Sequence, residues 1–255
     1  MKIELTRHHT SEYEIPVVLI PGFMEVATMW NPFLHAFKNH PVWIPEFPGH
    51  GKSPLEKQYS IPDLAESILL ALQQEDVGRF WVAGHSMGGY VASEMLHQKP
   101  SSIQKMALFQ STSRPDSEEK KAYRDRAVAA VQENKNRFVR TTIQSLFTPS
   151  KKEAHSSEVE ALITTACSMP TEAISAALLA MKNRHDHLNT VKSHRAKCSL
   201  FIGADDPRLN PIESVAEHQE VNFALFASAP KCGHMAHIED PIWGESFLTM
   251  WANAQ

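Results

Sequence analysis

The sequence predicts an α/β fold, with a mostly parallel, doubly wound sheet and a helical insertion in the middle of the chain. Short apolar runs bounded by Gly, Pro or Asp alternate with helical patterns, which is typical of a parallel sheet wound with helices. These runs are apolar throughout rather than alternating, as expected for strands covered on both faces. A chain of 255 residues, 42% of them hydrophobic, is large enough for one such domain.

The strands are expected in a regular order along the chain. Residues 3–6 and 12–14 indicate an N-terminal hairpin. The central strands are expected at residues 17–20, 42–47, 80–83, 106–109, 199–202 and 223–226. After the second of these, Ser60 and Asp63 have the Ser-x-x-Asp spacing of a helix cap, and Leu64, Ile68 and Leu72 then share one face. A helix is therefore predicted from about residue 61.

The alternation of strands and helices stops over residues 113–192. This segment has many charges and no convincing strand, and Ile174, Leu178 and Leu179 have helical spacing. An ordinary long helical crossover is the alternative, but about eighty residues is long for a crossover between strands. We therefore expect residues 1–112 and 193–255 to form the two parts of one α/β core, and residues 113–192 to be a helical cap inserted between them.

The strongest chemical signal is the sequence Gly84-His85-Ser86-Met87-Gly88, which follows the strand at 80–83 and precedes a helical pattern at 90–96. A sharp turn from strand to helix exposes a serine hydroxyl above the sheet, and glycines on both sides keep side chains out of the crowded corner. The N-terminal N–H groups of the helix favour negative charge that develops there. The context predicts that Ser86 is a nucleophile.

A nucleophilic serine needs a base, and the base needs an acid that orients it. Asp205 and Asp206 follow the strand at 199–202, and His234 and His237 follow the run at 223–226. These positions lie beyond the carboxyl ends of strands, where open α/β sheets place their sites. The chain order of serine, acid and histidine is the one used by folds that carry the Gly-x-Ser-x-Gly turn.

With these residues the chain resembles the α/β-hydrolase-fold serine hydrolases, esterase-like and with a helical cap, from about residue 15 to the C-terminus. Three further stretches carry the resemblance. The family's oxyanion loop is similar to Leu19-Ile20-Pro21-Gly22-Phe23. Its Gly-His-Gly-x-Ser turn is similar to Pro48-Gly49-His50-Gly51-Lys52-Ser53. The stretch that carries its catalytic histidine is similar to Gly233-His234 and the continuation through Pro241.

The resemblance implies a role for each residue. Ser86 would be the nucleophile, His234 the base and Asp206 the acid, with the Gly-x-x-Asp spacing selecting Asp206 over Asp205. The backbone N–H groups of Met87 and Phe23 would form the oxyanion hole, with Met24 as the alternative to Phe23. Gly22 and His85 would contact substrate. One departure is Pro21, where the family usually has a histidine that braces the loop.

The function implied by the resemblance is hydrolysis of carboxylic esters of small to medium acyl groups through an acyl-enzyme. One alternative is carbon–carbon hydrolysis, or a menaquinone-pathway-type lyase reaction, on an anionic substrate. Five arginines in the predicted cap would suit an anion: Arg114, Arg124, Arg126, Arg137 and Arg140. A second alternative is a small-molecule receptor that retains the triad. Different residues therefore bear on these alternatives. Triad chemistry depends on Ser86 and on Asp206 or Asp205, and an anionic substrate would depend on the cap arginines.

Composition narrows the partners that we expect. A formal charge of −4 without a basic patch argues against nucleic-acid binding, and no apolar run approaches the roughly 20 residues of a membrane span. Three distant cysteines favour free thiols and a cytoplasmic location. The histidine pairs at 8–9 and at 185 and 187 lack the spacing of a closed zinc site, so we expect solvated histidines and neither metal nor cofactor. The expected partner is a small-molecule ester, and the chain is expected to be a monomer or homodimer.

Overall fold

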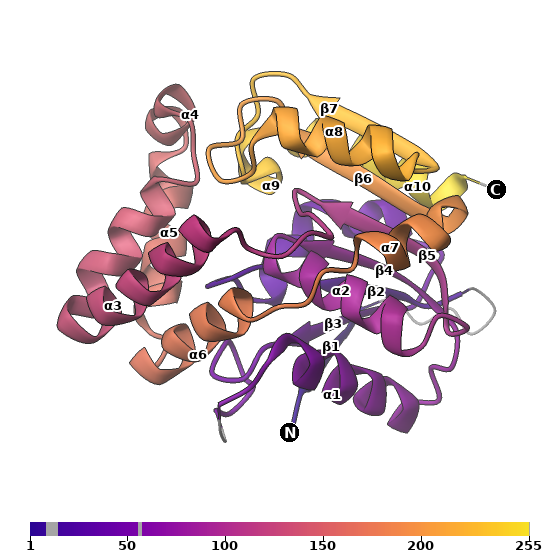
Figure 1. The fold of residues 1–255 in the computed structure, drawn as a ribbon, viewed down its shortest axis with the longest axis horizontal. Helices are drawn as coiled ribbons and strands as arrows, with labels where there is room; N and C mark the ends of the chain where they lie inside the picture. The colour runs from indigo at the N-terminus through magenta and orange to yellow at the C-terminus, as the bar shows by residue number, and fades with distance from the viewer. Residues whose placement is uncertain (9–14, 56–57, 255) are drawn as a thin grey trace.

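The computed structural model of the chain describes residues 1–8, 15–55 and 58–254. Within these residues, seven strands form one sheet in the order β1-β3-β2-β4-β5-β6-β7 (Figure 1). Strand β1 is antiparallel to β3, and the other pairings are parallel. The mostly parallel, doubly wound sheet is confirmed, while residues 12–14 of the expected hairpin lie outside the described residues.

The strands lie close to the predicted segments. Their bounds are β1 (Glu4–His8), β2 (Val17–Ile20), β3 (Val42–Glu46), β4 (Phe80–His85), β5 (Ile103–Phe109), β6 (Cys198–Gly203) and β7 (Leu225–Ala229). Strands β2, β3, β4 and β6 are buried along their whole length, which explains why their sequences are apolar without alternation.

Helices cover both faces of this sheet. On one face lie η1 (Ala27–Phe37), a 3₁₀ helix, and α10 (Pro241–Asn253), which contact each other through an aromatic cluster that includes Trp30, Phe109 and Trp251. On the other face lie α1 (Ile61–Gln74), α2 (Met87–Gln98) and α8 (Pro211–Val221). The capping box predicted for α1 is present, because the Ser60 hydroxyl accepts from the Asp63 N–H and the Asp63 carboxylate accepts from the Ser60 N–H.

Helices α3 to α6 form the inserted region between β5 and β6 (Figure 1). Their bounds are α3 (Glu118–Gln144), α4 (Pro149–Ala154), α5 (Ser156–Cys167) and α6 (Thr171–Lys182). The long helix α3 is interrupted at Asn134, whose backbone is not helical and whose side chain accepts from the Arg137 N–H at 3.0 Å. The following helix α7 (Leu188–Ser193) contacts α2 and α8 of the core, and η2 (Arg195–Lys197) leads into β6.

No single helix in the described part of the chain is long and apolar enough to cross a membrane. Helices α5 and α6 reach that length and composition only as a pair, and the pair is bent by 100° at its break.

Candidate active site

The turn between β4 and α2 places Ser86 at the carboxyl edge of the sheet. The backbone of Ser86 has φ 49° and ψ −114°, outside the usual regions for a residue with a side chain. The turn is tight because a Cβ on Gly84 would lie 2.2 Å from the Gly88 oxygen, and one on Gly88 would lie 2.3 Å from the Ile20 oxygen. Only glycine fits at either position, as expected for a turn that exposes a serine hydroxyl.

Two loops from the far half of the sheet bring a histidine and a carboxylate to this serine. His234 Nε2 lies 2.9 Å from Ser86 Oγ, and His234 Nδ1 lies 2.7 Å from Asp206 Oδ2. The imidazole and the carboxylate are both almost fully buried. The three side chains therefore form the continuous hydrogen-bonded series that a serine–histidine–acid triad requires.

The two candidate aspartates differ in burial and in hydrogen bonding. Asp205 is exposed, whereas Asp206 is buried and its second oxygen Oδ1 accepts from the backbone N–H groups of Arg208 and Leu209 at 2.8 and 2.9 Å. With both oxygens held, the Asp206 carboxylate has one orientation toward His234. Gln110, which follows β5, accepts from the Ala236 N–H at 3.0 Å and so helps to hold the histidine loop instead of supplying an acid.

The loop after β2, which is the predicted oxyanion loop, is braced by Glu25, a residue that the sequence analysis did not single out. The Gly22 N–H donates to Glu25 Oε2 at 2.6 Å, and the Glu25 N–H donates to the Gly22 oxygen at 3.3 Å. Glu25 thus holds the loop in which Pro21 cannot make the imidazole contact typical of the family. The sequence offers one signal for Glu25: it is a single acidic residue within an apolar segment that continues through Val26 and Ala27.

Glu25 also pairs with His85, the residue before the nucleophile. His85 Nδ1 lies 2.6 Å from Glu25 Oε2, and His85 Nε2 lies 2.9 Å from the His234 backbone oxygen. Both partners are acceptors, so only the doubly protonated imidazolium satisfies both. Burial opposes charge on each group, but their mutual attraction outweighs it, raising the pKa of His85 and lowering the pKa of Glu25 to about 2.

The positions predicted for oxyanion stabilisation and substrate contact differ in what they offer. Among the described residues, no acceptor lies on the backbone N–H of Phe23 or Met87, so both remain candidates for the oxyanion hole. Met24 has a positive φ of 61° and its side chain is buried. The Gly22 N–H is already bound to Glu25, and both ring nitrogens of His85 have protein partners. The Gly22 N–H and the His85 ring nitrogens, which were predicted to contact substrate, therefore make their hydrogen bonds within the protein.

A cavity of about 690 Å³ opens above Ser86 and is bounded by the inserted helices. Leu146 and Met181 line it from the inserted region, and Phe23 and Met235 line it from the core. The Leu146 backbone oxygen also accepts from the His234 N–H at 3.1 Å, so the inserted region contacts the histidine loop directly. The cavity is large enough for a small-molecule substrate.

Three of the five arginines predicted for an anionic substrate line this cavity: Arg114, Arg124 and Arg126. Arg114 is paired with Glu220 at 2.5 Å, and Arg124 is paired with the buried Asp116 at 3.1 Å. Arg137 and Arg140 are not among the lining residues, and Arg140 is paired with Glu160 on the surface. Most of the positive charge predicted to face a substrate is thus neutralised by protein carboxylates.

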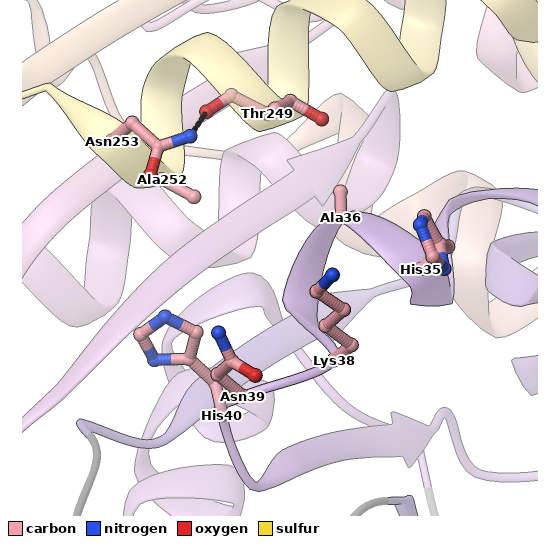
Figure 2. Close-up of a pocket in the computed structure, with 8 residues that line it drawn as sticks. All are labelled: His35, Ala36, Lys38, Asn39, His40, Thr249, Ala252 and Asn253. Atoms are coloured by element: carbon pink, nitrogen blue, oxygen red, sulfur yellow. Dashed lines mark hydrogen bonds between the residues drawn. The ribbon is translucent and has the colours of Figure 1, made fainter.

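A second, smaller pocket lies between the end of η1 and the end of α10 and contains no acid among its lining residues (Figure 2). His40 lies against Trp81, the second residue of β4, so this pocket is at the amino end of the parallel strands. Active sites of open α/β sheets form at the opposite end, where Ser86 lies.

Two groups of side chains within the described residues have the composition of a metal site. In the first, Glu25, His85 and His237 are fully buried, and burial lowers the pKa of His237 to about 4. His85 uses both nitrogens as hydrogen-bond donors, so this group does not fit a cation. The second group is Glu94, His185 and His187. The prediction of solvated histidines is wrong for His187, which is buried because it packs against Glu94 beneath the end of the inserted region.

Comparison with known proteins bears on the family and the fold. The model of the alpha/beta hydrolase fold family matches residues 15–241. Among solved structures, a thermophilic esterase from Thermogutta terrifontis superposes with a TM-score of 0.89 over 98% of this chain and 92% of the esterase, at 24% sequence identity. At that identity the likeness establishes the fold.

Curated relatives match over shorter segments. A lipase (LipV) of Mycobacterium tuberculosis is 28% identical over 93 residues, which is 36% of each chain. A 2-succinyl-6-hydroxy-2,4-cyclohexadiene-1-carboxylate synthase of Pectobacterium atrosepticum is 26% identical over 76 residues, or 30% of each chain. The matches thus span about a third of the length of these relatives.

Proposed function

We propose that this chain, which belongs to the alpha/beta hydrolase fold family, is a serine hydrolase that cleaves carboxylic esters of small to medium acyl groups. The observation that carries the proposal is the series of hydrogen bonds from Ser86 Oγ through His234 to Asp206, at 2.9 and 2.7 Å. A buried, oriented imidazole in contact with a serine hydroxyl is the arrangement that acyl transfer requires.

In the proposed first half-reaction, Ser86 Oγ bonds to the ester carbonyl carbon while His234 Nε2 accepts the serine proton. Negative charge moves to the carbonyl oxygen, where the N–H groups of Met87 and Phe23 stabilise it. Asp206 stabilises the imidazolium. The intermediate collapses as the carbon–oxygen bond to the alcohol breaks and His234 gives its proton to the departing oxygen. The product of this half-reaction is an acyl ester on Ser86.

In the second half-reaction, His234 accepts a proton from water as the water oxygen bonds to the acyl carbon. Collapse of the second intermediate releases the carboxylic acid, and His234 returns the proton to Ser86 Oγ. The protein groups end in their starting protonation states. The residues named here account for every proton transfer in the reaction.

The charge of the cavity supports an uncharged ester over an anionic substrate. Asp116 pairs with both Arg124 and Arg184, and Arg184 also lies 3.9 Å above the Tyr90 ring. Among the described residues, Arg126 and Arg208 line the cavity without an ion pair, so they are the candidate anion contacts for the alternative carbon–carbon hydrolase or lyase reaction.

The first test is hydrolysis of p-nitrophenyl acetate, butyrate and octanoate by the wild type, by Ser86→Ala and by Ser101→Ala, which removes an exposed serine hydroxyl. We expect the wild type and Ser101→Ala to hydrolyse the shorter esters equally, and Ser86→Ala to lose about 10³-fold or more in kcat/KM. Equal rates for wild type and Ser86→Ala would contradict the proposal. Turnover of a carboxylate-bearing vinylogous diketone without ester hydrolysis would favour the alternative instead.

A further inference from the structure

A second cluster of chemically active side chains lies away from the triad, further along α2. Glu94 Oε2 is 2.7 Å from His187 Nε2 and 3.3 Å from His185 Nδ1. All three of these atoms lie within 4.8 Å of one another. The Glu94 and His187 side chains are buried, whereas that of His185 is 62% exposed, so the cluster is open to solvent on one side.

We infer that Glu94, His185 and His187 form a zinc-binding site with three protein ligands and one position open to water. Two imidazole nitrogens and one carboxylate oxygen are ligands that zinc takes in sites with an open position. Both imidazoles converge on the same carboxylate oxygen, Oε2. The proposal goes beyond ester hydrolysis and does not depend on it.

The two distances to Glu94 suit a tetrahedral ion after one small movement. Ligand atoms at 2.0–2.2 Å from zinc lie about 3.3–3.5 Å from each other. His185 Nδ1 and Glu94 Oε2 already have this separation, at 3.3 Å. His187 Nε2 and Glu94 Oε2 form a hydrogen bond at 2.7 Å, so replacing the proton between them by zinc requires the atoms to separate by about 0.6 Å.

Neighbouring groups hold two of the three ligands, Glu94 and His187, in place. Gln98 donates to the other Glu94 oxygen, Oε1, at 3.0 Å, and the backbone N–H of His187 donates to the Ser113 oxygen at 2.9 Å. The Glu94 carboxylate is therefore oriented by hydrogen bonds, as outer partners orient metal ligands.

The position of the site indicates what zinc would do. Glu94 belongs to α2, the helix that begins at the proposed nucleophile, while His185 and His187 lie between α6 and α7, where the chain returns from the inserted region to the core. An ion bound by all three would connect that return segment to α2. We expect zinc to stabilise the folded protein by linking the two, by an amount that grows with the logarithm of the zinc concentration above the Kd.

The test is isothermal titration of tag-free, EDTA-treated protein with zinc chloride, together with thermal unfolding with and without zinc. The variants are His185→Gln, His187→Gln and His35→Gln, which removes an exposed histidine far from the cluster. We expect one zinc per chain for wild type and His35→Gln, and a Kd at least tenfold weaker for the two cluster variants. Zinc should raise the Tm of wild type and not that of His185→Gln.

Absence of saturable zinc binding to the wild type would overturn the inference. The same holds if His185→Gln binds zinc as tightly as the wild type, because the ion would then sit elsewhere. His185 is largely exposed, so its replacement preserves folding even if the buried His187→Gln variant proves unstable.

Discussion

At the scale of single residues, the proposed site depends on a buried ion pair that takes no part in the chemistry. Glu25 holds the Gly22 N–H on one side and His85 on the other, and His85 donates to the His234 backbone oxygen. These contacts connect the oxyanion loop, the nucleophile turn and the histidine loop. We regard Glu25 and His85 as positioning residues, because Glu25 Oε2 and both ring nitrogens of His85 are held by partners within the protein.

Removing both members of this pair should cost less stability than the two single removals add up to. Glu25→Gln leaves the buried His85 unpaired, and we expect it to lower the free energy of unfolding by about 3–5 kcal/mol. In Glu25→Gln/His85→Gln the loss should be clearly smaller than the sum of the two single losses, since no charge is left unpaired. Urea unfolding of the four proteins measures this coupling. Additive losses would show that the two side chains do not act as a pair.

Sequence reasoning at this scale predicted the residues that a motif marks, and missed those that only the fold brings together. Ser86 follows from its turn, and His234 and Asp206 from their places after strands; the structure puts all three within hydrogen-bonding distance. Glu25 has no motif, and its partner His85 is 60 residues away in the chain. Burial of His187 was missed for the same reason, because Glu94 is 93 residues away.

At the scale of elements, the turn from β4 to α2 is a tightly constrained segment. Its geometry depends on close approach of backbone atoms at Gly84 and Gly88. Any side chain at these positions must displace backbone, which is costly in a packed interior.

A matched pair of glycine substitutions tests this constraint. A Cβ on Gly84 would lie 2.2 Å from the Gly88 oxygen, whereas a Cβ on Gly78 would have nothing within 4 Å. We expect Gly84→Ala to lower the free energy of unfolding by about 1–3 kcal/mol or more and to reduce ester hydrolysis, and Gly78→Ala to change neither. Chemical denaturation and initial rates provide the two readouts. Equal stability of the two variants would mean that the turn tolerates a side chain.

Most strands could be predicted from the sequence because burial on both faces leaves an uninterrupted apolar run, as in β2. Strand β7 was predicted at 223–226 and lies at Leu225–Ala229. Phe223, which suggested the earlier start, packs in the core before the strand begins, just after the left-handed Asn222 that ends α8. The strand itself continues through Ala-Ser-Ala, which has little intrinsic strand preference.

At the scale of the whole molecule, the core and the inserted helices meet at the proposed site. The Leu146 oxygen binds the His234 N–H, and a Cβ on Gly49, in the turn after β3, would lie 2.3 Å from Ala173 of α6. The helical character of the insertion was predictable from its spacing and charge. Which of its arginines reach the cavity was not, because their carboxylate partners Asp116 and Glu220 are set by tertiary packing.

Stability should fall as the pH is lowered from about 6.5 toward 4. Burial lowers the pKa of His50 to about 4, so between these values the unfolded chain takes up a proton that the folded protein does not. His237 acts in the same direction, whereas the raised pKa of His85 acts only above about 6.5. We expect His50→Gln to reduce this loss by about 3 kcal/mol across the window, as measured by urea unfolding at several pH values. An unchanged slope in His50→Gln, matching that of His35→Gln, would contradict this assignment.

The central claim is that Ser86 is a nucleophile activated by His234 and Asp206, and covalent labelling with a fluorophosphonate tests it most directly. Attack by Ser86 Oγ on phosphorus expels fluoride and adds one phosphonyl group, which intact-mass and peptide mass spectrometry locate. We expect one label per chain, at Ser86, with the same rate in Asp205→Asn and a rate roughly 10³–10⁴-fold lower in Asp206→Asn. Labelling at another residue, or an equal rate in Asp206→Asn and Asp205→Asn, would contradict the account.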